Sequence, residues 1–424
     1  MPKSGNVEDS EMGRTCATVQ NYFRLLDQAP NYRRNQGELA ALTSNARMRA
    51  AGARAPFPRI IPVVVHLIFA NDADELDDQQ VVSQIDVLNA DYGGTNDDLA
   101  QVPEPFKPFI GKAGLRFVLA PVAPSGAETT GITRTRTDVT AFSPDDAMKS
   151  AATGGADAWD TERYLNIWVC RLSGGLLGYA QFPGGPSATD GVVIGSSCFG
   201  IGGRANAPFD LGRTATHEVG HWLNLSHIWG EERIPTCDDI DDVEDTPNQL
   251  GPNTGDPVFP TSSCPGQPHG DMFMNYMDYV NDASMFMFSV QQVERMHAAL
   301  EFSRANLGVG MTLGEQRSGT DYLLDKVWVR SPEEEGPGER VFRPEGFPLP
   351  PVRARERVLF REDGSIEALH PGADDRPAST LGRWALTDDA GSTGLLLDLD
   401  RVSGRMSVVE IAADRLRLAK RASE

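Results

Sequence analysis

The feature that most constrains this chain is a histidine-rich segment near its middle. It reads His217-Glu218-Val219-Gly220-His221-Trp222-Leu223-Asn224-Leu225-Ser226-His227. Positions i and i+4 of a helix lie on one face, so His217 and His221 can point the same way and bind one metal ion. Glu218 then lies one position round the helix, beside that ion. A continued helix would carry His227 too far along its axis, so we expect the chain to turn back just after Leu223.

Asn224 is the residue at which this turn can form. After glycine, asparagine best tolerates the left-handed backbone conformation that ends many helices. His227 can then return to the other two histidines as a third ligand. Three neutral imidazoles with an open fourth position are typical of catalytic zinc, so the sequence predicts zinc bound by His217, His221 and His227. The alternative, a chance H-E-x-x-H on a solvated helix, is disfavoured by the third histidine in register.

These residues resemble the signature of the metzincin metalloproteases, H-E-x-x-H-x-x-G-x-x-H, with Asn224 in the glycine position. The wider string, which continues after His227 as Ile228-Trp229-Gly230, is similar to the pappalysin family of metzincins. Further along, the chain reads Asp271-Met272-Phe273-Met274-Asn275-Tyr276-Met277-Asp278-Tyr279. The resemblance makes Met277 the methionine of the turn beneath the metal and Tyr279 the tyrosine near the zinc, whose phenol can donate to an oxyanion. Without the neighbouring motif, Met277 would indicate only a residue of the hydrophobic core.

The first 59 residues are polar, rich in arginine and alanine, and unlike a catalytic core. A thiolate is an excellent zinc ligand, and the resemblance implies that Cys16 blocks the open zinc position of a latent precursor. An ordinary leader cysteine is the alternative. The arginines between Arg47 and Arg59 offer points at which such a leader would be cut.

The chain has five cysteines. The resemblance implies a disulfide between Cys237 and Cys264, and therefore an oxidising compartment. It also implies a secreted protein, although no signal peptide is visible in the chain. Cys170 and Cys198 lie in apolar, strand-like surroundings and are expected to be buried thiols.

An acidic run lies in the same part of the chain, with six acids among the eight residues from Asp238 to Asp245. Oxygen ligands that are crowded on a loop suit calcium. The run resembles a calcium loop of the pappalysin family, in which Asp241, Thr246 and the carbonyl of Glu244 would be ligands. The alternative is a solvated charged face.

The apolar patterns predict an α+β catalytic domain. The segment 60–69 is β-branched and apolar and indicates a buried strand. A helix that Asp77 can cap follows it, and Ser289 opens a last helix with a capping box. More strands are expected at 115–119, 164–169, 176–182 and 191–194. The resemblance implies a metzincin-type fold, in which a twisted mixed sheet with a backing helix and an active-site helix lies above a looser lower subdomain.

The length of 424 residues exceeds one compact core. We expect a leader over 1–59, the metzincin catalytic domain over 60–302, a linker over 303–324 and a small β-rich domain over 325–424. Short alternating segments in the last of these indicate an antiparallel sandwich or barrel, which the resemblance does not cover.

The net charge of −21 argues against binding to nucleic acid or to an anionic membrane surface. No apolar run is long enough to span a membrane. The implied partners are protein or peptide substrates.

Together these features predict a zinc endopeptidase with Glu218 as general base. Two alternatives stay open: a non-catalytic binding protein with structural zinc, which would not need Glu218, and a zinc hydrolase of non-peptide substrates. The resemblance also implies a preference for a basic residue just after the scissile bond. Asp282 is the carboxylate that would meet it, unless it faces solvent or holds the turn.

Overall fold

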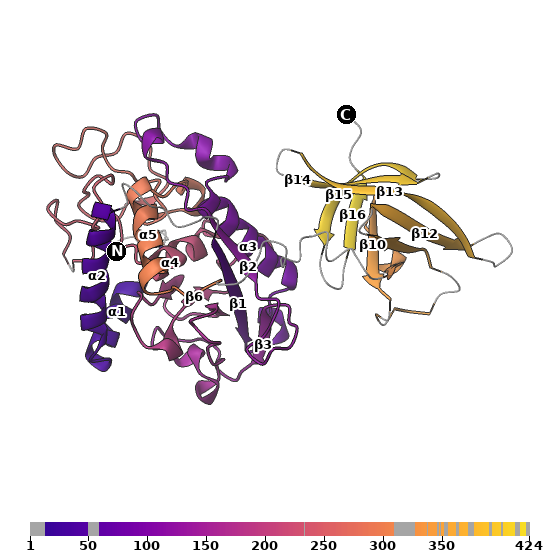
Figure 1. The fold of residues 1–424 in the computed structure, drawn as a ribbon, viewed down its shortest axis with the longest axis horizontal. Coiled ribbons are helices and arrows are strands. Elements are labelled where there is room, and N and C mark those ends of the chain that lie inside the picture. The colour runs from indigo at the N-terminus through magenta and orange to yellow at the C-terminus, as the bar shows by residue number, and fades with distance from the viewer. Residues whose placement is uncertain are drawn as a thin grey trace, which may run out of the picture. The chain divides into compact units, whose positions relative to one another are not determined.

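The computed structural model forms two compact units, residues 1–313 and 314–424 (Figure 1). The structure describes residues 13–49, 59–232, 234–308 and 327–420, the last range with gaps at 337, 346, 348, 352–354, 362–363, 372–376, 390–391, 400–401 and 412–415.

The first unit is built on a six-stranded mixed sheet. Its strands follow the order β2 (Leu115–Leu119), β1 (Arg59–Phe69), β4 (Leu165–Cys170), β6 (Val192–Gly195) and β5 (Gly178–Ala180), and β3 (Ile132–Arg136) pairs with the second half of β1. β5 runs antiparallel to β6 and forms one edge of the sheet. All of β1 beyond Arg59 is buried, as the uninterrupted apolar run predicts for a strand that is covered on both faces.

Two helices connect the sheet to the rest of this unit. α3 (Asp78–Gly93) begins after Asp77, whose side chain accepts a hydrogen bond from the Gln80 amide at 2.8 Å, as the sequence predicts. α4 (Arg213–Trp222) carries the first two histidines. The Tyr92 hydroxyl of α3 donates to the carbonyl of Thr216 in α4 at 2.9 Å, so the two helices are fixed to one another.

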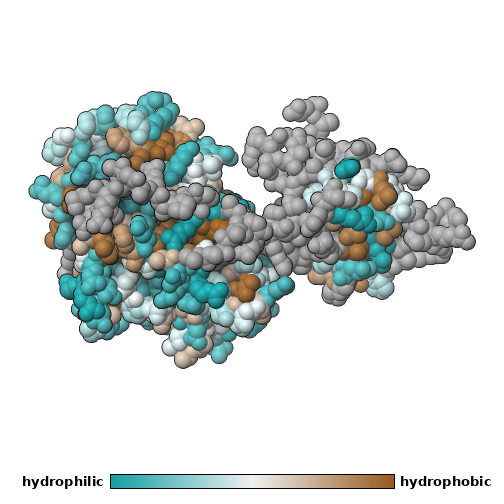
Figure 2. All heavy atoms as spheres, viewed as in Figure 1, coloured by the Kyte–Doolittle hydropathy of each residue, from teal (hydrophilic) through white to brown (hydrophobic). Residues whose placement is uncertain are grey.

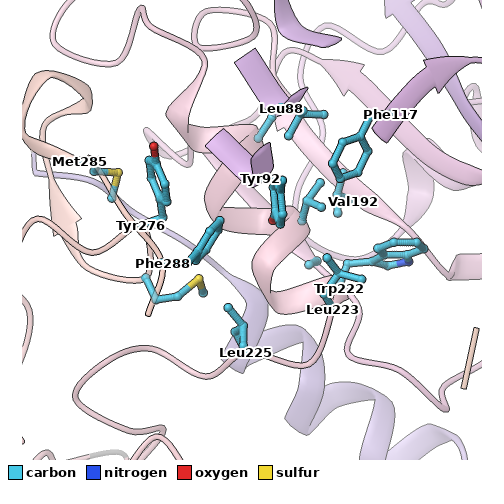
Figure 3. Packing of buried hydrophobic residues seen from close by; sticks show 14 of the residues in the cluster. Leu88, Tyr92, Phe117, Val192, Trp222, Leu223, Leu225, Tyr276, Met285 and Phe288 are labelled. Atoms are coloured by element: carbon cyan, nitrogen blue, oxygen red, sulfur yellow. The ribbon is translucent and has the colours of Figure 1, made fainter. Parts of the chain in front are cut away.

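The lower part of the unit, from residue 223 to α5 (Val290–Phe302), is mostly loops with two short strands, β7 (Thr254–Gly255) and β8 (Tyr279–Val280). α5 opens with the predicted capping box of Ser289 and Gln292. One hydrophobic cluster joins this part to the sheet and helices. Figure 3 shows Tyr92 and Trp222 from the helices together with Tyr276 and Phe288 from the lower loops. α4 is therefore buried between the two halves.

The leader forms two helices, α1 (Thr18–Gln28) and α2 (Tyr32–Arg49), within the first compact unit. Leu25 and Tyr32 pack on Phe182, just beyond β5. α2 lies beside α5 (Figure 1). Most of the segment in which we expect the leader to be cut, residues 50–58, lies outside the described residues.

The second unit is a closed barrel, the second of the two all-β forms that the sequence indicates. Its strands follow the cyclic order β10-β16-β15-β14-β13-β12-β11-β9. Buried aromatic side chains, including Trp328, Phe342 and Phe360, fill its described interior. The strands are β9 (Val327–Arg330), β10 (Glu339–Pro344), β11 (Arg357–Phe360), β12 (Ser365–Pro371), β13 (Pro377–Asp389), β14 (Ser392–Leu399), β15 (Val402–Ile411) and β16 (Leu416–Lys420).

Hydrophilic side chains cover most of the face of the first unit that Figure 2 shows, as expected for a unit whose apolar side chains fill its interior. Among the described residues, no helix has the length and apolar character that crossing a membrane requires.

Candidate metal centre and active-site cleft

Three histidines converge at the end of α4. His217 and His221 lie on one face of this helix, which ends at Trp222. Asn224 follows with a φ of +74°, so the predicted left-handed turn is confirmed. The turn brings back His227, and the Nε2 atom of His221 lies 3.1 Å from the Nε2 atom of each of the other two. All three side chains are buried.

The other ring nitrogen of each histidine fixes its tautomer. The Nδ1 atoms of His217 and His221 each lie 2.7 Å from a main-chain carbonyl, that of Tyr276 and that of Leu225. A carbonyl can only accept, so each Nδ1 carries the proton. Burial lowers the pKa of His217 well below its usual range and that of His221 to about 3, which keeps both rings neutral.

The Nδ1 atom of His227 donates a hydrogen bond to the Glu231 carboxylate at 2.9 Å. The unprotonated Nε2 atoms of His217 and His221 therefore face one another and the Nε2 atom of His227. Nitrogen lone pairs this close repel one another unless a cation lies between the rings, and a set of three imidazoles suits zinc.

Glu218 lies beside this group, against the edge strand β5. A Cβ atom on Gly178 would come within 3.1 Å of its Oε1 atom, so glycine at this position leaves room for the carboxylate. Burial raises the pKa of Glu218 to about 7, although hydrogen bonds from Cys16 and Thr18 act in the opposite direction.

Met277 and Tyr279 pack against α4 and the histidines. Met277 is fully buried, and a Cβ atom on Gly220 would lie only 2.5 Å from its Sδ atom, so this methionine packs directly on α4. The Tyr279 ring lies 5.0 Å from the His227 ring between centroids. Burial raises the pKa of the Tyr279 phenol well above its usual range, and the phenol keeps its proton.

The leader covers this group of residues. The Sγ atom of Cys16 and one ring nitrogen of each of the three histidines all lie within 4.8 Å of one another. Cys16 also donates to Glu218 at 3.4 Å. The pKa of its thiol is raised mainly by burial and, to a smaller extent, by the charge of Glu218. A bound cation would oppose this rise, because a thiol that coordinates a metal is deprotonated.

The leader also pairs with the edge strand. Leu177 N donates to the carbonyl of Thr15, and Ala17 N donates to the carbonyl of Gly178, both at 3.1 Å. Cys16 and Gly178 form a parallel bridge. The leader thus takes up main-chain groups on β5 that would otherwise be open to an extended peptide.

Arg14 enters a buried pocket beside the histidines. Its Nη2 atom lies 2.5 Å from Asp282 Oδ1, its Nη1 atom donates to Thr214 Oγ1 at 2.9 Å, and its guanidinium lies over the Phe209 ring. The Oδ2 atom of Asp282 accepts from the main-chain amides of Leu211 and Arg213. Asp282 therefore does not face solvent: it holds the turn before α4 with one oxygen and meets a guanidinium with the other.

The acidic loop is only partly solvated. Asp241 and Thr246 are buried, and the Thr246 hydroxyl donates to the Asp241 carboxylate at 2.8 Å. Burial raises the pKa of Asp241 to about 7. Glu244 is exposed, and Asp245 accepts hydrogen bonds at the start of α5.

The cysteines are arranged as the sequence indicates. Cys237 and Cys264 form a disulfide, the pairing that the resemblance implies. Cys170 and Cys198 are buried free thiols.

Four residues of the site escaped the sequence analysis: Arg14, Thr18, Gly178 and Glu231. Arg14 contacts Asp282, and Thr18 and Gly178 contact Glu218, at separations of 268, about 200 and about 40 positions along the chain, and no local pattern marks them. Glu231 follows His227 by four positions, a spacing that could have suggested the contact.

Comparisons with known proteins agree with this geometry. The family model described as pregnancy-associated plasma protein-A matches residues 150–301. An extracellular metalloprotease of Arthroderma benhamiae is 33% identical over 276 residues, which cover 63% of this chain and 81% of that protein. Another from Verticillium alfalfae is 30% identical over 269 residues, covering 61% of this chain and 84% of the relative.

Solved structures are similar as well. A variant of Tannerella forsythia promirolysin is 42% identical, with a TM-score of 0.64, and the match covers 70% of this chain and 97% of that one. Mature mirolysin of the same organism in complex with a cleaved peptide is 47% identical, with a TM-score of 0.58 and coverage of 60% and 97%. With its three convergent histidines and the glutamate beside them, this chain is a zinc-dependent metalloendopeptidase that belongs to the pappalysin family of metzincins.

Proposed function

We propose that this endopeptidase is made in a latent form, that its zinc is held by His217, His221 and His227, and that Glu218 and Tyr279 are its catalytic residues. The observation that carries the proposal is the convergence of three Nε2 atoms beside a buried carboxylate at the edge of a sheet. A structural zinc site would not need that carboxylate.

The chemistry divides between the metal and the side chains. When bound, zinc supplies a Lewis acid that polarises the scissile carbonyl and acidifies water. Glu218 accepts the proton of the attacking water and passes it to the leaving amine. Tyr279, which keeps its phenolic proton, donates a hydrogen bond to the oxyanion that develops in the transition state.

The edge of β5 is the proposed docking line for substrate. The leader already occupies main-chain groups of Leu177, Gly178 and Ala180. An extended peptide can pair with the same groups once the leader has left, since an exposed sheet edge recognises a backbone in this way.

The Arg14 pocket supports the proposed preference for a basic residue after the scissile bond. Buried, charge-assisted contacts favour a guanidinium there, and lysine fits such a fork less well. In the leader, the arginine in this pocket (Arg14) comes before the residue at the metal position (Cys16). In a substrate, the residue after the scissile bond comes after the carbonyl that reacts at the metal. The leader therefore runs through the cleft in the direction opposite to that of such a substrate, which keeps its own peptide bonds out of position.

Latency by Cys16 is supported by the position of its sulfur among the histidine nitrogens and by the neighbour solved as a pro-form. The names of the extracellular relatives support secretion. The buried pair of Asp241 and Thr246 supports a calcium site that would also include the carbonyl of Glu244.

A cleavage assay on casein tests the proposed roles. The leader-free enzyme should cleave casein, a zinc chelator should stop it, and added zinc should restore it. Glu218→Ala should keep zinc bound but lose about two to four orders of magnitude in rate, the usual contribution of a general base. Cleavage by the purified variant at the unaltered rate would refute the role of Glu218.

A further inference from the structure

The third histidine is held differently from the other two. His217 and His221 direct their Nδ1 protons at main-chain carbonyls, whereas His227 directs its proton at the Oε2 atom of Glu231, 2.9 Å away. The Oε1 atom of the same carboxylate accepts from the main-chain amide of His227, also at 2.9 Å. Both oxygens of Glu231 are thus bound to one residue.

This difference has a structural reason. His217 and His221 are fixed by α4, but His227 lies in the loop after the left-handed turn, where no helix fixes its main chain. The two bonds from Glu231 fix its amide and its ring together, and the Trp229 ring stacks on the imidazole at 4.6 Å. A carboxylate that accepts the second ring proton also makes an imidazole a better metal ligand.

We propose that Glu231 is a positioning residue of the metal centre, which orients His227 and strengthens it as a ligand. This rests on the proposed role of His227 as a zinc ligand. Glu231→Gln keeps the size of the side chain but removes its charge and leaves one acceptor oxygen, so one of the two donors of His227 loses its partner.

Zinc affinity measured by competition with a chelator tests this without reference to activity. The full chain carries Glu218→Ala in every sample so that it cannot digest itself. Glu231→Gln should weaken zinc binding by about 10- to 100-fold, as loss of such a partner usually does. It should also alter the visible spectrum of the cobalt-substituted protein, which reports ligand geometry. Glu232→Gln, at the exposed neighbouring acid, is the matched control and should bind zinc as the parent does.

Equal affinity in the Glu231→Gln and Glu232→Gln proteins would overturn the role of Glu231 while leaving the three ligands intact. A parent protein without zinc affinity would overturn the ligand assignment and the role of Glu231 together.

A different contact, in the leader, concerns the catalytic carboxylate. The Thr18 hydroxyl donates to Glu218 Oε2 at 2.9 Å and accepts from the main-chain amide of Ala180 at 2.8 Å. Thr18 is fully buried. Its oxygen therefore links Glu218 to the edge strand and occupies one hydrogen-bonding position of that carboxylate oxygen.

Thr18 and Cys16 differ in the groups that they block. Cys16 lies among the histidine nitrogens and also donates to Glu218 Oε2 at 3.4 Å, whereas Thr18 bonds to the same oxygen at 2.9 Å and to β5. Removal of the cysteine sulfur would open the metal position and still leave Glu218 bound to the Thr18 hydroxyl.

We infer that the leader inhibits the enzyme in two ways, through Cys16 at the metal and through the Thr18 hydroxyl at the general base, and that the second persists when the cysteine is removed. The inference deepens the proposed latency and rests on Glu218 as the base. It predicts that a leader without its cysteine still slows the enzyme.

The test starts from the full-length Cys16→Ala protein and measures the initial rate on a short fluorogenic peptide before any leader is cut. Adding Thr18→Val, which keeps the β-branched shape without the hydroxyl, should raise this rate about tenfold, since a hydrogen bond to a charged group has about that effect. Adding Thr18→Ser should leave the rate low. Adding Asn21→Ala is the matched control, because the Asn21 side chain donates to the carbonyl of Ala180 at 2.9 Å and does not bond to Glu218.

Equal initial rates with and without Thr18→Val would overturn the inference. So would an Asn21→Ala effect as large as that of Thr18→Val, because the loss of any docking contact would then suffice. If the leader-free enzyme itself shows no hydrolysis, the proposed function fails and the role of Thr18 fails with it.

Discussion

Asp282 shows how one buried carboxylate can serve two purposes. Its Oδ2 atom is fixed by the amides of Leu211 and Arg213, which leaves Oδ1 to meet the guanidinium of Arg14. The carboxylate is therefore held in place before any ligand arrives. Preorganisation of this kind lowers the entropy that binding costs.

We expect Asp282→Asn to lose the preference for arginine after the scissile bond. The amide keeps the acceptor for the main chain but turns an NH2 group toward the guanidinium. Removing one partner of a buried ion pair costs about 2–5 kcal/mol, or at least about thirtyfold in the rate of cleavage before arginine. Mapping cut sites in a digested proteome by mass spectrometry measures this.

Lysine should be selected less strongly than arginine in the same digest by the unaltered enzyme. Dominance of apolar residues after the cut, or an arginine preference that survives Asp282→Asn, would contradict the assignment of the pocket.

At the scale of elements, α4 and the methionine turn are in contact through Gly220. We expect Gly220→Ala to destabilise the protein, although alanine raises helix propensity by about 1 kcal/mol. Its Cβ atom would lie 2.5 Å from Met277 Sδ, and overpacking of a core costs about 1–3 kcal/mol. Chemical denaturation measures the change.

A double-mutant cycle provides the control. In a Met277→Ala background the same Gly220→Ala change has room for its methyl group and should stabilise the protein. If Gly220→Ala stabilises the protein while Met277 is present, Met277 does not limit the size of the side chain that α4 can carry at position 220.

The acidic loop should gain stability from calcium. Burial holds the folded-state pKa of Asp241 at about 7, above its ordinary value, so ionisation of this group costs stability when no cation is bound. That cost grows as the pH rises from about 4 to about 7 and then stays constant. Calcium at about 100 times its dissociation constant should add about 2.7 kcal/mol.

Melting at pH 7.5, with zinc held constant and calcium varied, measures this gain. Asp241→Asn should abolish the calcium shift, whereas Asp238→Asn, at an exposed acid of the same loop, should keep it. No shift in the unaltered protein would leave the loop as a charged surface.

For the whole molecule, we expect latency to depend on the leader. The full chain should hydrolyse peptide slowly until a cut between Arg47 and Arg59 frees the cleft. Cys16→Ala should shorten this delay severalfold, because the metal position is then open. A time course of peptide hydrolysis, with N-terminal sequencing of the product, measures both the delay and the cut.

Cys170→Ala, at a buried thiol away from the histidines, is the control for loss of a cysteine and should keep the delay. An unchanged delay in Cys16→Ala would exclude Cys16 from latency.

The sequence by itself determined the parts that depend on local geometry. Helical spacing aligned His217 with His221, and the tolerance of asparagine for a positive φ placed the turn at Asn224. Alternating and continuous apolar runs predicted the strands, and the capping residues predicted where α3 and α5 begin. Each of these is a property of residues a few positions apart.

Only the tertiary structure decided what surrounds that centre. Arg14 meets Asp282 across 268 positions of the chain, and Thr18 meets Glu218 across 200. Such contacts depend on how the leader docks against β5 and on the loops after α4, which no short pattern encodes. A sequence records which residues carry the chemistry, but packing over the whole unit determines which distant side chains fill and block the cleft.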